Sequence, residues 1–240
     1  MRPAIHDRNR SDETRNRIVS ASVSAFSEHG LAGARTQAIA KAAQVNKAML
    51  YYYFKSKDDL YAAALESVAK KVMENSLEAL QSNCSEGERL LRLALNHFDR
   101  ILTQQEFQNL MQQEMIRFRK GEGAFPVLVK NLFQPLMQEM GKIVRAGMRK
   151  GELCETDWLQ VIYATLGANV FYFLSAPLMR IVVPFEPYSQ SELKSRRQAA
   201  LQFLGSALFV DRKHGALLAK RVLKDRPMPG VKKLSHWRTA

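Results

Sequence analysis

Residues 36–57 read TQAIAKAAQVNKAMLYYYFKSK, and this stretch decides the fold of the N-terminal part of the chain. Thr36 is the predicted cap of a helix over residues 37–43, and Asn46 is the predicted cap of a second helix over residues 47–53. Ala40 is small enough to let the two helices cross closely. Apolar residues recur at helical spacing on both sides of the turn, at Ile39, Ala40, Ala43, Val45, Leu50 and Phe54. Two short crossing helices joined by a turn are typical of a helix-turn-helix.

The second helix of such a motif enters the major groove of DNA. Lys47 can donate to guanine O6 and N7, and Ala48 and Met49 can contact a thymine methyl. Thr36 can hold a phosphate together with the free N–H groups of a helix start. The tyrosines at 51–53 have hydroxyls that can reach the DNA backbone, although the first and third fit the core of the domain equally well. The predicted DNA-binding residues are Thr36, Gln37, Lys47, Ala48, Met49, Tyr51, Tyr52, Tyr53 and Lys57.

A longer stretch, residues 14–65, reads TRNRIVSASVSAFSEHGLAGARTQAIAKAAQVNKAMLYYYFKSKDDLYAAAL. It resembles the N-terminal domain of the TetR family of bacterial transcriptional regulators. The most specific part is Leu50-Tyr51, Tyr53-Phe54 and Ser56-Lys57, followed by acidic residues and Leu60. The resemblance implies that Lys57 is a phosphate-binding lysine. One departure is Gln44, which stands where the family usually has Gly, and a left-handed Gln costs about 1 kcal/mol relative to Gly.

Helical spacing and capping residues continue to the end of the chain, and no stretch alternates apolar and polar residues as a half-buried strand would. The predicted class is therefore all-α. Pro177–Pro187 is predicted to be a loop, Pro135 a bend, and Thr156, Ser85 and Ser189 helix caps. The predicted helices cover approximately 12–28, 37–43, 47–53, 56–80, 85–102, 105–119, 126–150, 157–174 and 190–209.

The net charge of +13 lies at the two ends of the chain. Residues 1–57 carry +6, residues 211–240 carry +7, and the middle is neutral. This distribution favours nucleic acid as the partner of the ends, with an anionic membrane surface as the second candidate. The predicted division is a flexible basic arm (1–11), a helix-turn-helix domain (12–57), a helical ligand-binding and dimerisation domain (58–210) and a basic tail (211–240). Arg10, Arg15 and Arg17 fit either a solvated arm or DNA contact.

The stretch from Trp158 to Met179 has no charged residue and is long enough to cross a bilayer. We favour a helix pressed against another helix, because large residues at spacings of three and four make one of its faces much more apolar than the other. The resemblance implies that residues 157–174 and 190–209 pair with their copies in a homodimer. The predicted interface residues are Leu159, Ile162, Leu166, Val170, Ala199, Ala200, Phe203 and Ala207.

The resemblance also implies a repressor that a small-molecule effector releases from an inverted-repeat operator. The neutral middle of the chain and its Met and Phe content favour an apolar or weakly polar effector. Such side chains can line an apolar pocket, but they are also ordinary core residues. The predicted ligand-binding residues are His97, Met111, Met115, Phe118, Phe133, Met137, Phe171 and Tyr172.

Nothing in the sequence favours catalysis. The five histidines are scattered, Cys84 and Cys154 are isolated, and no phosphate loop or nucleophile motif occurs. We therefore expect no cofactor, no metal and a cytoplasmic regulator rather than an enzyme. The alternatives are an all-α enzyme and a basic membrane-surface protein.

The tail contains a stretch that can form a basic amphipathic helix, with the apolar residues Leu217, Leu218, Val222 and Leu223 placed between the basic residues Lys220, Arg221 and Lys224. It either packs against the regulatory domain or contacts DNA or an anionic surface. The sequence leaves both possibilities open.

Overall fold

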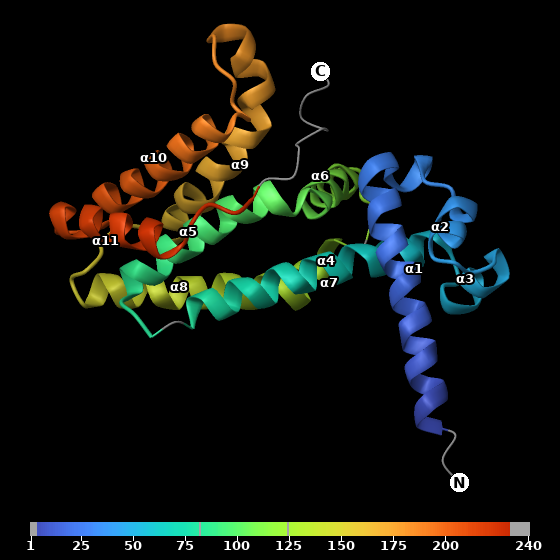
Figure 1. Cartoon of the computed structure of the whole chain (residues 1–240). Coiled ribbons are helices and arrows are strands. Elements are labelled where there is room, and N and C mark those ends of the chain that lie inside the picture. Colours follow the sequence, from blue (N-terminus) through green and yellow to red (C-terminus); the bar gives the residue numbers. More distant parts are fainter. Residues whose placement is uncertain (1–3, 82, 124, 231–240) are drawn as a thin grey trace. The chain divides into compact units, whose positions relative to one another are not determined.

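The computed structural model describes residues 4–81, 83–123 and 125–230, and the regular elements in them are helices (Figure 1). An isolated bridge between Leu153 and Phe209 is the exception. The all-α class is confirmed. The helices are α1 (Ala4–Gly33), α2 (Thr36–Ala42), α3 (Lys47–Tyr53), α4 (Lys57–Leu80), α5 (Glu86–Thr103), α6 (Gln105–Arg119), α7 (Phe125–Leu128), the π-helical turn η1 (Val129–Phe133), α8 (Gln134–Arg149), α9 (Trp158–Val182), α10 (Gln190–Leu208) and α11 (Arg212–Asp225).

These helices form two compact units. The first contains the described residues up to Met73 together with those of Gln105–Phe133, and the second contains Glu74–Gln104 and the described residues from Gln134 onward. The boundary therefore lies inside α4 and not at residue 57, where the sequence placed it. The reason is that α6 packs against α1 and buries Leu110 and Met111 in the same core as the helix-turn-helix.

The core of the first unit holds α1, α2 and α3 together. Phe26 of α1 meets the ring of Tyr61 edge-on, with 5.1 Å between the ring centroids. Ile39 and Leu50 are buried in the same cluster. Burying a side chain of this size stabilises the fold by about 1.5–3 kcal/mol. The two short helices therefore owe their stability to this packing, because an isolated helix of seven residues is marginal in water.

Two predictions, one in the first unit and one that spans the boundary between the units, are wrong. Residues 4–11 belong to α1 and are not a flexible arm, because a stretch without Pro or Gly continues the helix toward the N-terminus. The expected single helix over 126–150 is divided into α7, the turn η1 and α8. Pro135 offers a reason, because it has no N–H to bond the carbonyl of Asn131, and the ladder widens into a π-helical turn just before it.

The second unit packs α5 against α8, α9, α10 and α11. The crossing of α10 and α11 depends on two glycines, since a Cβ on Gly205 would lie 2.5 Å from the carbonyl oxygen of Gly215. On the inner side of α11, Leu218, Ala219 and Val222 are buried. The described part of the basic tail thus packs against its own unit, and residues 231–240 lie outside the described residues.

Helix α9 continues to Val182, so the predicted loop over 177–187 is wrong for its first part. Pro177 cannot donate to the carbonyl of Phe173, and the hydroxyl of Tyr188 donates to that carbonyl instead, at 3.3 Å. The freed acceptor is therefore satisfied and the helix passes the proline. Its cap is Asp157, whose carboxylate accepts from the N–H of Leu159, and not Thr156.

By length and composition α9 is the one helix in the described part of the chain that is able to cross a membrane. It packs against α5, α8 and α10 in the second unit. Its apolar residues do not lie on one face, because Ile162 and Phe173 are buried while Tyr163 and Phe171 are exposed. The predicted single apolar face is thus wrong, and the helix is apolar on both sides.

Candidate nucleic-acid interface

The turn between α2 and α3 has the geometry of a helix-turn-helix. Gln44 adopts a left-handed backbone with φ 57°, as its position in place of a glycine predicts. The N–H of Val45 donates to the carbonyl of Ala40 at 3.0 Å, which closes the turn. The cost of this conformation for a residue with a Cβ is about 1 kcal/mol. Figure 1 shows α2 and α3 side by side next to α1.

The two helix starts differ. Asn46 caps α3 as predicted, and its side-chain oxygen accepts from the N–H of Met49 at 2.7 Å. At α2 the cap is Arg35, which has an extended backbone and makes no side-chain capping bond. Thr36 is the first helical residue, so its hydroxyl is not in the capping position that the sequence predicted. It is half-buried, and Gln37 beside it is exposed.

Helix α3 presents a mixed surface to solvent. Leu50 is fully buried and fixes the helix to the core, while Lys47 and Ala48 are exposed. Met49 is 42% exposed and Tyr52 is 81% exposed. The ammonium and phenol groups of this helix can donate to base edges and phosphates. Its methyl and thioether groups can make apolar contacts with bases.

Tyr51 and Tyr53, for which the sequence left both DNA contact and core packing open, lie in different environments. Tyr51 is partly exposed and outside the buried core, and the ammonium of Lys47 lies 5.9 Å from its ring centroid. Tyr53 packs at the edge of the core, with its hydroxyl 3.1 Å from the Oγ of Ser11. This contact ties the N-terminal half of α1 to α3, and the sequence contained no local signal for it because the two residues are far apart in the chain.

Lys57 is the first residue of α4, and its ammonium donates to the carbonyl of Ala32 at 3.2 Å. An ammonium has three donors, so two remain for an anion. Of the basic residues on α1, Arg15 stacks over the ring of Phe54 at 5.2 Å and Arg17 donates weakly to Thr14, at 3.4 Å. Arg10 is exposed.

The predicted dimer residues lie on α9 and α10 of the second unit. Phe203 on α10 is 70% exposed. Val170 on α9 is exposed as well, and so are Ala199 and Ala207 on α10. Ile162 is only 2% exposed because it faces the core of its own unit, so its assignment to an interface is wrong. The other predicted residues are half-buried, at Leu159, Leu166 and Ala200.

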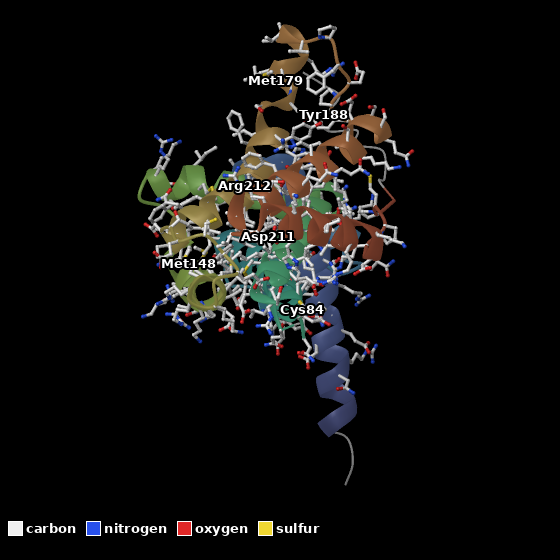
Figure 2. The ribbon with its side chains drawn as sticks, turned by 90° about the vertical axis from the view of Figure 1, so that its left-hand side faces the viewer. Cys84, Met148, Met179, Tyr188, Asp211 and Arg212 are labelled. Carbon is white, nitrogen blue, oxygen red and sulfur yellow. The ribbon has the colours of Figure 1, made fainter. Side chains whose placement is uncertain are left out.

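The exposed apolar surface of α9 is larger than the sequence predicted. We name it the α9 stripe, and its residues follow helical spacing at Tyr163, Val170, Phe171, Leu174, Leu178, Ile181 and Val182. Figure 1 shows the C-terminal end of α9 projecting beyond α10, and Figure 2 labels Met179 in that part of the helix. The spacing from Val170 onward was visible in the sequence, but Pro177 concealed that the helix continues through it.

The α9 stripe borders a groove of about 470 Å³ between α9 and α10. Its lining includes the small residues Ala168, Ala199 and Ala200, with Phe203 beside them. Thr165 and Asn169 line the groove as well, and Asn169 is fixed by a bond from its amide to the carbonyl of Ala94. A shallow apolar groove next to exposed aromatic residues is the form that a helix of a second subunit fits.

The predicted ligand-binding residues are divided between the two units, and four of them belong to the first. There Met111 is buried in the core, Phe133 packs against it, and Met115 and Phe118 are exposed. In the second unit Phe171 is 69% exposed on the α9 stripe, so its assignment to a pocket is wrong. The remaining residues of the set are more enclosed, at His97, Met137 and Tyr172.

His97 is held between α5 and α9. Its Nδ1 lies 3.5 Å from the amide nitrogen of Asn169, and burial, with a smaller effect of Arg100, lowers its pKa to about 3. The imidazole is therefore neutral, and Nδ1 accepts from the amide. Among the described residues no group of three or more His, Cys, Asp or Glu is arranged to hold a metal ion.

The sequence of this chain is similar to that of known proteins. Residues 18–64 match the family described as "Bacterial regulatory proteins, tetR family", and residues 87–204 match "Tetracyclin repressor-like, C-terminal domain". The transcriptional repressor NicS of Pseudomonas putida is 28% identical over 170 residues, which cover 69% of this chain and 77% of NicS.

Solved structures share the fold. A TetR transcriptional regulator from Chloroflexus aurantiacus has a TM-score of 0.64 at 18% identity and covers 84% of this chain and 98% of its own. AibR, crystallised with isovaleryl coenzyme A and operator DNA, has a TM-score of 0.61 at 14% identity and covers 81% of this chain and 97% of its own. The chain therefore belongs to the TetR family of bacterial regulators and is a helix-turn-helix transcriptional regulator that binds DNA.

Proposed function

We propose that the protein is a cytoplasmic repressor that binds an inverted-repeat operator as a homodimer and leaves it when a small molecule binds. The observation that carries the proposal is the exposed surface of α3, with Lys47, Ala48, Met49 and Tyr52 outward and Leu50 in the core. One such helix reads one half-site, so two copies are needed for an operator with half-sites about 34–36 Å apart.

The residues proposed to read bases are Lys47, Ala48 and Met49. Tyr51, Tyr52 and Lys57 are proposed to hold the DNA backbone, with Thr36 and Gln37 at the start of α2. Tyr53 has a hydroxyl that Ser11 already engages, so it is proposed to position α3. Where the Ser11 hydroxyl is the donor of that bond, the O–H of Tyr53 is left to donate to a phosphate.

The α9 stripe and Phe203 support the homodimer. Soluble monomers rarely expose apolar patches of more than a few hundred Å², and a stable homodimer buries about 800 Å² on each partner. Charge also favours a second copy of this chain as the partner, because Arg180 is the one charged residue of α9 and it pairs with Glu186 at 3.1 Å. A second copy of this neutral surface is therefore a better partner than a polyanion.

Effector control is supported by the relatives and by the division of the chain into two compact units, of which one contains the helix-turn-helix. AibR was crystallised with both an acyl coenzyme A and operator DNA, and NicS is a repressor. A ligand shifts the equilibrium between two states only by its differential affinity for them, and a change from 1:99 to 99:1 needs about 5.5 kcal/mol. The neutral middle of the chain favours an effector that is apolar or weakly polar.

The experiment that tests the proposal is selection of duplexes from a random pool by the purified full chain. We expect an inverted repeat whose half-site centres lie one or more helical turns apart, and slower migration of that duplex in gel retardation. Lys47→Ala should lose the base preference, while the charge-matched control Lys194→Ala, at an exposed position of α10, should keep it. Recovery of no common sequence from the pool would contradict the proposal.

A further inference from the structure

The exposed side of α9 carries a regular row of residues, which we name the α9 seam. Its members repeat at alternating spacings of three and four, and they are Ala164, Gly167, Phe171, Leu174, Leu178 and Ile181. An average of about 3.5 residues per turn is the spacing along which two helices of a coiled coil pack. The buried residues Ile162 and Phe173 lie on the other side of the helix.

The α9 seam has a half with small residues and a half with large ones. At its start Ala164 is exposed and Gly167 is half-buried. In the described part of the chain nothing lies within 4 Å of the position that a Cβ on Gly167 would take. From Phe171 onward the side chains are large, and their exposed fractions lie between 57% for Leu174 and 84% for Ile181. One face of one helix therefore presents both an open hollow and projecting apolar side chains.

The large half is fixed to the loop that follows it, although it projects beyond α10 (Figure 1). The hydroxyl of Tyr172 donates to the carbonyl of Pro187 at 2.7 Å, and the hydroxyl of Tyr188 donates to the carbonyl of Phe173 at 3.3 Å. Figure 2 labels Tyr188 at this junction and Met179 in the projecting part. Because these bonds already order the end of α9, a partner that binds it has little conformational entropy to remove.

The chemistry of the α9 seam selects a neutral partner. Arg180 is the one charged residue of α9, and helical spacing places it on the side opposite the seam, where it pairs with Glu186. The helix cannot fill its own hollow, because Leu178 lies roughly 16 Å from Gly167 along the axis at about 1.5 Å per residue. A second copy of α9 offers apolar side chains without an opposing charge. It also continues the surface that the proposed homodimer buries.

The sizes along the α9 seam favour one orientation of two such helices. Around a twofold axis, residues of two antiparallel helices that are equally far from the axis meet. With the axis between Phe171 and Leu174, each large side chain of the projecting half faces a small residue of the second copy, because Leu178 meets Gly167 and Ile181 meets Ala164. A parallel pair would place Leu178 against its own copy and leave the hollow at Gly167 empty.

We propose that two copies of the chain pair in antiparallel orientation along the α9 seam, about a twofold axis between Phe171 and Leu174. Leu178 of each copy then fills the hollow at Gly167 of the other. The inference rests on the proposed homodimer and specifies its register. It gives the part of α9 beyond Pro177 a role, since this part supplies the side chains that enter the partner.

Disulfide cross-linking of the full chain tests the register, in a background in which Cys84→Ser and Cys154→Ser remove both cysteines. Co-expressed Gly167→Cys and Leu178→Cys chains should form a covalent heterodimer, because a disulfide joins Cβ atoms about 3.5–4.5 Å apart. Leu178→Cys alone should not cross-link, because its two copies lie roughly 16 Å apart along the seam. Leu217→Cys, exposed on α11, is the matched control and should not cross-link to Gly167→Cys. Mass spectrometry of the non-reduced product identifies the joined residues.

An exchange of side-chain sizes tests the same contact without a cross-link. Gly167→Leu should raise the Kd of the dimer about tenfold or more in sedimentation equilibrium, because the new side chain occupies the hollow that Leu178 of the other copy needs. Its own helix should stay intact in circular dichroism, since the added Cβ meets open space and glycine is the weaker helix former. The double variant Gly167→Leu/Leu178→Ala restores a large residue opposite a small one and should regain most of the affinity.

The outcomes separate this register from the proposed homodimer. In a protein that sediments as a dimer, absence of the cross-link between positions 167 and 178 would overturn the register alone, as would self-cross-linking of Leu178→Cys or an unchanged Kd in Gly167→Leu. A chain that sediments as a monomer at micromolar concentration would contradict the homodimer as well. If such a monomer floats with phosphatidylcholine vesicles and Leu178→Asp abolishes this, the seam binds lipid and not a second copy.

Discussion

The surfaces of α3 and α9 are both exposed, yet their chemistry differs. Each helix is fixed from behind by buried side chains, Leu50 under α3 and Ile162 and Phe173 under α9. On α3 the outward side chains include a cation and phenols, which suit a polyanion. On α9 the outward side chains are apolar over most of the helix, and Ile181 is 84% exposed. The comparison teaches that exposure marks a binding surface and that side-chain chemistry tells which partner it fits.

The largest effect that distinguishes the two surfaces is expected from a charge on the α9–α10 side. Phe203→Asp would place a carboxylate in an apolar interface, which costs several kcal/mol unless the charge is paired. The proposed dimer should dissociate at micromolar concentration in analytical ultracentrifugation. Leu217→Asp, which changes an exposed leucine of α11, is the matched control and should remain dimeric. A folded Phe203→Asp variant that stays dimeric would place the interface elsewhere.

The second prediction concerns base reading by α3. Lys47→Ala should weaken operator binding by about 1–3 kcal/mol and relax the preference for operator over scrambled DNA. Fluorescence anisotropy with both duplexes at one salt concentration measures this. If Lys47→Ala lowers the affinity for the two duplexes equally, the residue contacts phosphate and does not read a base.

The third prediction concerns the inner side of α9. His97 is neutral in the fold because burial lowers its pKa to about 3, whereas an unfolded histidine titrates near 6.5. A depressed pKa of the folded state means that its contribution to stability is present above about pH 6.5 and is lost as the pH falls toward 3. The expected slope is roughly 1.4 kcal/mol per pH unit in that window.

Chemical unfolding at pH 7.5 and 5.5 measures the effect. His97→Gln should lose less stability between these two values than the unchanged protein does, by about 1 kcal/mol. His29→Gln, at an exposed position of α1, is the control and should leave the difference in stability unchanged. If His97→Gln loses as much stability between these pH values as the unchanged protein does, the neutral imidazole of His97 does not hold α9 against α5.

The sequence predicted the first unit in more detail than the second, for a physical reason. The turn at Gln44, the cap at Asn46 and the inward Leu50 are local features, so neighbouring residues determine them. The continuation of α9 past Pro177 depends on Tyr188, which closes the gap in hydrogen bonding from outside the helix. Such a long-range partner leaves no pattern in a single sequence.

The candidate sites, too, could be predicted where neighbouring residues determine them and not where long-range contacts do. The exposed face of α3 could be predicted residue by residue, because helical spacing decides which side chains point away from Leu50. The predicted ligand set was chosen by residue type alone, and the fold distributes it between a buried core, an exposed stripe and a polar contact at His97.

The smallest expected effect separates phosphate contact from base reading within the α3 region. Lys57 lies at the start of α4, where its ammonium bonds to the carbonyl of Ala32 and keeps two donors for a phosphate. Lys57→Ala should therefore weaken operator and scrambled duplex alike. Because one counterion fewer is released, the slope of log K against log salt should become shallower by about one unit. Lys194→Ala on α10 should leave the slope unchanged. A slope equal to that of the unchanged protein would assign Lys57 to the contact with α1 alone, and a loss confined to the operator would move it among the base-reading residues.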